Sequence, residues 1–216
     1  MDKLKHDRRF EEKRRTMVER QLKSRGISNP QVLAAFYRVP REIFVPAGLE
    51  NKAYEDHPLP IGHDQTISQP YVVALMTESL EPLSSDRVLE IGAGSGYQTA
   101  ILAELVAQVY SIEIVEELFK IAKMRLVHLG YQNVHLKHDD GRNGWSEEAP
   151  FDKIIVTAGA TEIPSALVAQ LKEDGRVVIP IGYGDQDLIL GRKEKGVLIT
   201  KQLIPVRFVP IQTELS

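Results

Sequence analysis

The spacing of apolar and polar positions changes at about residue 83. The first part shows the spacing of helices, with an Asn-Pro pair that is typical of an N-cap followed by the first helical residue. We predict helices over residues 9–25, ending at Gly26, over 30–36 with Asn29 as the N-cap, and from Pro70 to Leu80. The proline-rich stretch Val39–Gly62 is predicted to be mostly loop.

From Arg87 onward, short and wholly apolar segments alternate with helical ones. The predicted strands are 88–91, 109–112, 134–136, 154–156 and 176–179, and the predicted helices are 97–105, one ending at Gly130, and 164–171. In the tail, residues 188–190 and 197–209 alternate like an antiparallel pair. Apolar strands separated by helices are typical of a parallel sheet covered on both faces.

We therefore predict an α/β fold that is doubly wound and Rossmann-like. Its sheet is mostly parallel, with an antiparallel C-terminal strand pair and a helical N-terminal extension. The extension covers residues 1–82 and the core covers 83–216, together forming one compact unit.

The composition is that of an ordinary soluble globular protein, with 216 residues, 43% hydrophobic and 26% charged. The chain has no cysteine, which excludes disulfides, thiolate catalysis and cysteine-based zinc sites. The first residues lack the apolar region of a secretory signal, and no run approaches the roughly 20 apolar residues of a membrane span. We expect a cytoplasmic protein without a membrane partner.

Charge is distributed unevenly along the chain. Residues 1–25 carry ten Lys or Arg against five acids, which gives +5 there and −8 over the remainder of a chain with net charge −3. Such an arm could bind nucleic acid or an acidic membrane surface. The interleaved acids and the lack of interleaved aromatic residues instead favour the solvated face of a helix. We expect a monomer that binds no nucleic acid.

The segment VLEIGAGSGYQ, residues 88–98, carries the strongest chemical signal. Gly92, Gly94 and Gly96 follow a predicted strand and precede a predicted helix, so the backbone can turn sharply and approach a ligand closely. Glu113 ends the next predicted strand, where an acid can hold ribose hydroxyls.

The third glycine comes one residue earlier than in the dinucleotide fingerprint G-x-G-x-x-G. Glu90 suits the cationic sulfonium and amino groups of S-adenosylmethionine better than a pyrophosphate. The pattern E-x-G-x-G-x-G therefore favours an S-adenosylmethionine-dependent methyltransferase. A dinucleotide enzyme, or a turn needed only for packing, is the alternative.

A metal site is not expected. His135, His138 and Asp139 lie close in the sequence, but residues three apart on a strand point to opposite faces of the sheet. Tyr97 and Trp145 are predicted to be packing residues.

Blocks along nearly the whole chain match one known family. They are MVERQLKSRGI (17–27), VPREIFVP (39–46), IGHDQTISQPYVVALMTESL (61–80) and VLEIGAGSGYQTA (88–100), followed by YSIEI, DDGRNGW and APFDKIIVTAGA. In these blocks the chain resembles the protein-L-isoaspartate O-methyltransferase family. The glycine motif alone indicates only the methyltransferase superfamily, whereas Q-T-I-S-Q-P together with the other blocks is specific to this family.

The resemblance implies methyl transfer from S-adenosylmethionine to the free α-carboxylate of L-isoaspartyl residues in damaged proteins and peptides, leaving S-adenosylhomocysteine. It implies that the cofactor is bound by Glu90, Gly92 and Gly94 at its methionine end, by Glu113 at the ribose, and by Asp140 and Gly141 at the adenine, with Gly96 a further cofactor-binding residue. The family reads G-D-G where this chain has Asp139-Asp140-Gly141.

The resemblance also makes Ser68 the active-site serine, with Thr66 and Ile67 beside it in the substrate-binding loop and Pro205–Ile211 flanking the peptide. The acceptor carboxylate is ionised at neutral pH, so positioning and partial desolvation suffice and no general base is needed. Because Ser68 precedes a predicted helix that starts at Pro70, capping that helix is an alternative role.

Two other functions remain open. One is a related S-adenosylmethionine-dependent carboxyl methyltransferase that acts on a small acid. The other is a non-catalytic module that binds nucleic acid through the basic N-terminal helix.

Overall fold

The N-terminal part forms the helical extension that the sequence predicts. In the computed structural model, which describes residues 8–212, helix α1 (Arg8–Met17) continues through a π turn (Val18–Leu22) and a 3₁₀ turn (Lys23–Arg25). Gly26 then ends the run in the left-handed conformation, with φ 98°.

The next two helices also begin as predicted, each with Pro at its first position. Helix α2 (Pro30–Arg38) is capped by Asn29, whose side-chain oxygen accepts hydrogen bonds from the first backbone N–H groups of the helix. Helix α3 (Pro70–Ser79) follows the predicted loop region. None of the helices within residues 8–212 is long and apolar enough to cross a membrane.

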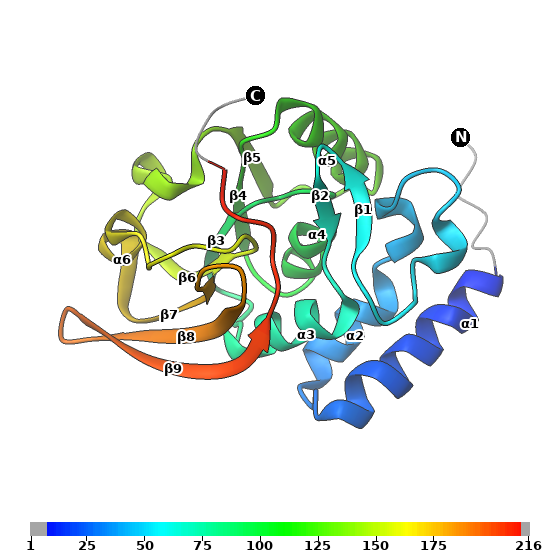
Figure 1. Cartoon of the computed structure of the whole chain (residues 1–216), viewed down its shortest axis with the longest axis horizontal. Helices are drawn as coiled ribbons and strands as arrows, with labels where there is room; N and C mark the ends of the chain where they lie inside the picture. Colours follow the sequence, from blue (N-terminus) through cyan, green and yellow to red (C-terminus); the bar gives the residue numbers. More distant parts are fainter. Residues whose placement is uncertain (1–7, 213–216) are drawn as a thin grey trace.

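A seven-stranded sheet forms the centre of the described molecule, with strand order β5-β4-β3-β6-β7-β8-β9 (Figure 1). Strands β5 to β7 in this order are parallel, whereas β8 is antiparallel to β7 and β9 to β8. This confirms the predicted mostly parallel sheet with its antiparallel C-terminal pair. The strands are β3 (Arg87–Ile91), β4 (Gln108–Glu113), β5 (Val134–His138), β6 (Phe151–Val156), β7 (Leu171–Ile181), β8 (Gln186–Glu194) and β9 (Val197–Val206).

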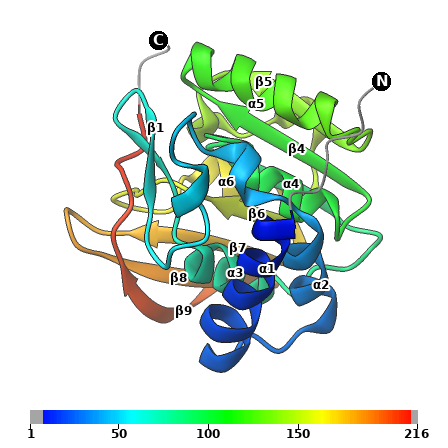
Figure 2. The ribbon, with the colours of Figure 1, turned by 90° about the vertical axis from the view of Figure 1, so that its right-hand side faces the viewer.

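Each face of the sheet is buried by its own layer. Helices α4 (Tyr97–Ala103) and α5 (Glu116–His128) join the N-terminal helices on one face, where Val88 points. Helix α6 (Ser165–Gln170) packs on the other face, where the neighbouring Leu89 points. The N-terminal segment accordingly lies on the side away from α6 (Figures 1 and 2).

This winding creates a crevice at the carboxyl end of β3. The chain leaves β3 for β4 on one side, while β6 comes to lie on the other side of β3. In open α/β sheets ligands bind where the strand order reverses in this way. The fold therefore places a ligand site next to the glycine turn that follows β3.

The stretch predicted to be mostly loop contains structure that the sequence did not reveal. Strands β1 (Leu59–Gly62) and β2 (Gln65–Ile67) form an antiparallel hairpin, and 3₁₀ turns cover Arg41–Phe44 and Glu50–Lys52. The hairpin turns through His63 and Asp64, both at positive φ. The prolines in and around β1 led to the prediction of a loop, although β1 pairs with a strand that begins only three residues after it ends.

The basic N-terminal segment is only partly the solvated face that was predicted. Arg14 is 4% exposed, and its guanidinium donates to the Tyr54 hydroxyl (3.0 Å) and to the backbone oxygens of Tyr37 and Arg38. It also forms an ion pair with Glu42 (3.3 Å). This arginine therefore fastens α1 to α2 and to the loop after it. Lys3 and Lys5 of the same segment lie outside the described residues.

Candidate active site at the carboxyl ends of the strands

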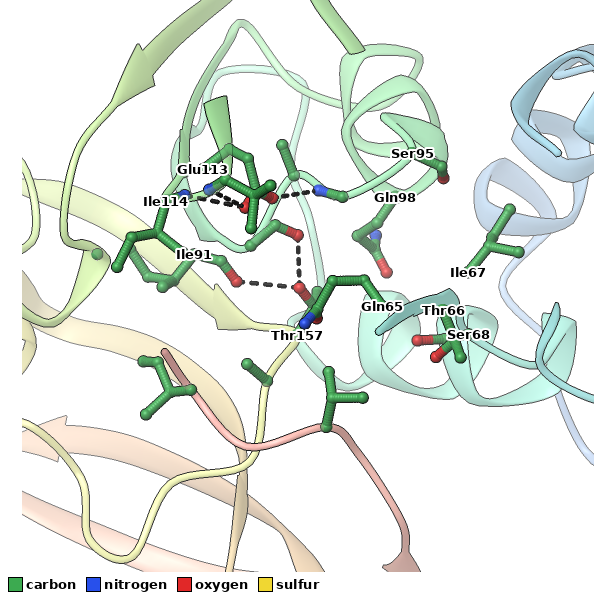
Figure 3. A pocket seen from close by; sticks show the side chains of 18 of the residues that line it. Gln65, Thr66, Ile67, Ser68, Ile91, Ser95, Gln98, Glu113, Ile114 and Thr157 are labelled. Atoms are coloured by element: carbon green, nitrogen blue, oxygen red, sulfur yellow. Dashed lines mark hydrogen bonds between the residues drawn. The ribbon is translucent and has the colours of Figure 1, made fainter. Parts of the chain in front are cut away.

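A pocket lies in the crevice between β3 and its two neighbours (Figure 3). The empty space in it, counted together with the open solvent at its mouth, is about 860 Å³. Every wall comes from a different part of the chain. The walls include residues 65–68 of the hairpin, 91–95 after β3, 112–115 after β4, Gly141 after β5, 157–158 after β6 and 209–212 near the C-terminus.

The glycine turn lets the backbone form part of the pocket wall. Gly92 has φ 94°, and a Cβ atom added to it would lie 2.6 Å from the Thr157 hydroxyl oxygen. That hydroxyl lies 2.6 Å from the Gly92 carbonyl and 3.0 Å from the Ile91 carbonyl, so it fastens the turn to the end of β6. Only glycine fits at this position, for reasons of both space and φ.

Glu113 lines the pocket at the end of β4, as predicted, and is held there by backbone groups. One carboxylate oxygen accepts from the Gly94 N–H (2.7 Å), and the other from those of Ile114 and Val115 (2.9 Å each). The carboxylate thus fixes the glycine turn and the start of the next segment relative to each other. An ionised carboxyl group has about four acceptor sites, so one is left for a ligand.

At the end of β5, glycine again lines the pocket while its acidic neighbour does not. A Cβ atom on Gly141 would lie 2.3 Å from Ile91, so the chain passes directly over β3. The Asp140 carboxylate instead pairs with Arg142, at 2.7 Å, and that ion pair lowers the pKa of Asp140. Asp140 is not among the side chains that line the pocket.

The structure places Glu90 and Gly96 differently from the expectation that both border a cofactor. Glu90 is completely buried, and one of its oxygens accepts hydrogen bonds from the Thr99 and Ser111 hydroxyls (2.6 Å each). Burial raises its pKa to about 7. Gly96 is the N-cap of α4, and its α-carbon faces Ala122 of α5. Neither residue lines the pocket: Gly96 packs against α5, and Glu90 points to the opposite face from Ile91, the one residue of β3 that reaches the pocket.

The hairpin contributes two hydroxyl groups at the opposite wall. Thr66 and Ser68 lie two residues apart and, in Figure 3, project the same way, while Ile67 between them is buried. Both hydroxyl residues also line a second hollow, shared with Tyr71 of α3 and with residues 204–208 at the end of β9. They therefore separate an inner pocket from an outer groove.

The alternative role of Ser68 as a helix cap is not realised. The N-cap of α3 is Gln69, and no side chain makes a capping hydrogen bond there. The backbone oxygen of Ser68 accepts a hydrogen bond of 2.7 Å from Arg41, whose side chain is fully buried. The serine is thus anchored through its backbone, and its side chain is left for the pocket.

Residues 209–212, most of them within the expected peptide-flanking segment, close one side of the inner pocket. The carbonyl of Val209 accepts from the Gly159 N–H, and the Ile211 N–H donates to the Gly159 carbonyl (2.8 Å each). Gln186 binds both backbone groups of Phe208 just before it. The C-terminal segment is therefore tied to the loop after β6.

Several residues of the site were not predicted from the sequence. Tyr97, expected only to pack, also lines the pocket, as do Gln98 and Thr157. Thr157 follows a predicted strand, so the rule that ligands bind at the carboxyl ends of strands could have found it. Trp145 packs as expected, edge-on to Tyr110. His135 stacks on the same Tyr110 ring, and no group of three metal-ligand side chains occurs in the described part of the chain.

Comparison with known proteins identifies close relatives. A family model described as protein-L-isoaspartate(D-aspartate) O-methyltransferase matches residues 12–216. A protein-L-isoaspartate O-methyltransferase of Opitutus terrae is 53% identical over 97% of this chain and 91% of its own, and one of Dictyoglomus turgidum is 52% identical over 95% and 94%.

Solved structures of proteins with the same description have a similar fold. A protein-L-isoaspartate O-methyltransferase superposes with a TM-score of 0.86 at 33% identity, covering 94% of this chain and 67% of the other. A putative protein-L-isoaspartate O-methyltransferase from Plasmodium falciparum, in complex with S-adenosyl-L-homocysteine, has a TM-score of 0.80 at 28% identity, covering 92% and 98%.

Proposed function

The chain belongs to the protein-L-isoaspartate(D-aspartate) O-methyltransferase family, and we propose from this that it methylates the free α-carboxylate of L-isoaspartyl residues in damaged proteins and peptides. One structural observation carries the proposal. A pocket at the switch point of the sheet shares its Thr66 and Ser68 wall with an outer groove, so two ligands can meet there.

The residues of the inner pocket fit S-adenosylmethionine. This cofactor supplies a methyl group on a positively charged sulfur, and transfer breaks that carbon–sulfur bond, forms a carbon–oxygen bond and leaves S-adenosylhomocysteine. Glu113 has an acceptor site left for a ribose hydroxyl. Gly92 and Gly94 present backbone at the wall, and Gly141, packed directly against Ile91, does the same at the end of β5.

The substrate carboxylate needs orientation and no base. Its pKa is about 4, so at neutral pH it is already the nucleophile. In this proposal the Thr66 and Ser68 hydroxyls donate hydrogen bonds to it and hold it in line with the methyl group. The resulting ester lets the following amide nitrogen displace methanol and close a succinimide. Hydrolysis of that ring restores part of the normal linkage.

The outer groove fits the peptide on either side of the damaged residue. An extended peptide would lie between Tyr71 and the end of β9, at residues 204–208, with its carboxylate reaching past Ser68. Contacts to peptide backbone would give broad sequence tolerance. We further propose that the protein acts in the cytoplasm as a monomer without nucleic acid. Its lack of cysteine suits a reducing compartment.

The test uses two synthetic peptides that differ only in an isoaspartyl or aspartyl linkage, with S-adenosylmethionine labelled in its methyl group. We expect base-labile label on the isoaspartyl peptide alone. Ser68→Ala should lower kcat about 10- to 100-fold, because one hydrogen bond to a charged group is lost. Binding of S-adenosylhomocysteine should be unchanged. Ser84→Ala, at an exposed serine, is the matched control.

Two results would contradict the proposal. Equal labelling of both peptides would indicate a carboxyl methyltransferase that acts on other acids. Binding of nucleic acid with a steep salt dependence, and no methyl transfer, would favour the non-catalytic alternative.

A further inference from the structure

A buried side-chain oxygen next to the pocket lacks a hydrogen-bond partner. Gln98, in the first turn of α4, lines the inner pocket and is 7% exposed. Its side-chain oxygen has almost no solvent contact and accepts no hydrogen bond. Leaving a buried acceptor unpaired costs stability, and such exceptions call for an explanation, one of which is a missing ligand.

Neighbouring groups determine which end of the Gln98 amide is unpaired. The Thr77 hydroxyl lies 2.8 Å from the Val73 carbonyl, which can only accept, so its single hydrogen is used there. The Thr77 oxygen can then only accept from Gln98, and it lies 3.0 Å from the amide nitrogen. The amide nitrogen is thereby fixed on Thr77, and the oxygen is the free end.

The free oxygen requires a donor, which excludes the substrate carboxylate. Figure 3 shows Gln98 between Ser95 and the hairpin wall of Thr66 and Ser68, across the pocket from Glu113. With a ribose hydroxyl on Glu113, the methionine end of the cofactor would lie toward the Gln98 side. That end carries an ammonium group with three donor hydrogens. Glu113 is the only acid among the described lining residues, so no second carboxylate takes the ammonium.

We propose that the Gln98 side-chain oxygen accepts a hydrogen bond from the α-ammonium group of S-adenosylmethionine and of its product, with Thr77 acting as the positioning residue. The inference rests on the proposed function, since it assumes this cofactor. Gln98 then selects for the amino group without a charge of its own. A neutral acceptor also leaves the pocket free of a second carboxylate that would repel the substrate.

The test is binding of two probes measured by calorimetry, without turnover. One probe is S-adenosylhomocysteine, and the other is its analogue with hydrogen in place of the α-amino group. Gln98→Leu should raise the Kd of S-adenosylhomocysteine about 10- to 100-fold and change that of the analogue by less than about twofold. Thr77→Val, which frees the amide to rotate, should weaken the same probe by a smaller factor. Gln132→Leu, at an exposed glutamine, is the matched control.

The outcomes separate this inference from the proposed function. If Gln98→Leu raises the Kd of both probes equally, the ammonium contact is overturned in favour of a packing role for Gln98. Unchanged S-adenosylhomocysteine binding with a raised KM for the peptide would overturn it in favour of a peptide N–H donor. If Gln98→Leu unfolds at a lower temperature without ligand, the Kd values of the two probes for Thr77→Val decide. Weakening of S-adenosylhomocysteine alone supports the proposal, and equal weakening of both probes overturns it. A wild-type chain that binds neither probe would overturn the proposed function itself.

Discussion

The three glycines of the turn after β3 have separate reasons to be glycine. Gly92 approaches the Thr157 side chain too closely for any Cβ atom, and Gly94 donates its N–H to Glu113. Gly96 lies against α5, at the start of α4. A shared sequence pattern therefore combines a steric, a hydrogen-bonding and a packing requirement, and only the first two face the pocket.

Gly92→Ala tests the steric requirement. The variant would combine an unfavourable φ with a Cβ atom 2.6 Å from the Thr157 oxygen, and would displace the turn. We expect a free energy of unfolding lower by about 2–4 kcal/mol and a loss of S-adenosylhomocysteine binding. Gly130→Ala is the control, because Gly130 has φ 83° but no atom within 4 Å of the added carbon. Similar stability and binding in both variants would contradict the role of the contact.

Among the elements, Arg41 links three segments that are distant in sequence. Its guanidinium donates to the carbonyls of Ala53 and Ser68 (2.7 Å each) and lies over the Tyr97 ring at the start of α4. Burial lowers its pKa to about 10, so it stays charged at neutral pH. The turn at Arg41–Phe44, the serine loop and α4 are thereby held in one arrangement.

Arg41→Met should weaken this arrangement. The buried Ala53 carbonyl and the partly buried Ser68 carbonyl would lose their donor, and we expect the free energy of unfolding in urea to fall by about 2–4 kcal/mol. Turnover of the isoaspartyl peptide should fall as well, because the Ser68 backbone loses its anchor. Arg192→Met is the control, since Arg192 makes only exposed ion pairs and should change stability very little. An Arg41→Met variant as stable as the control would refute the linking role.

At the scale of the whole molecule, Glu90 couples folding to pH. Burial raises its pKa from 4.5 to about 7, although the Ser111 and Thr99 hydroxyls oppose the shift. Between about pH 4.5 and 7 the folded chain keeps a proton that the unfolded chain has released. The free energy of unfolding therefore falls as pH rises through this window.

Glu90→Gln should remove this contribution while keeping an oxygen to accept from Thr99 and Ser111. We expect wild type to lose stability relative to the variant, by roughly 3 kcal/mol at most, from pH 4.5 to above pH 7. Denaturation at several pH values measures the difference. Glu12→Gln, at an exposed glutamate, should keep the wild-type slope. Parallel slopes in wild type and Glu90→Gln would disprove the assignment.

The amino-acid pattern alone predicted the strands and helices of the core, the glycine turn and the place of Glu113. These features depend on periodicity and turn chemistry within a few neighbouring residues, which a sequence displays directly. Ser68, Thr66 and Gly141 were found through family resemblance, and the structure places all three at one pocket.

Only the tertiary structure decided which way Glu90 turns, that residues 59–62 pair with 65–67, that Arg41 anchors the Ser68 backbone, and that Gln98 lines the pocket. Each of these depends on contacts between segments far apart in the chain or on which face of a strand meets which layer. Glu90 and Ile91 are neighbours on β3 and point to opposite faces of the sheet, so Glu90 lies in the core and Ile91 lines the pocket. Local sequence does not specify that facing, because both layers bury apolar side chains equally well.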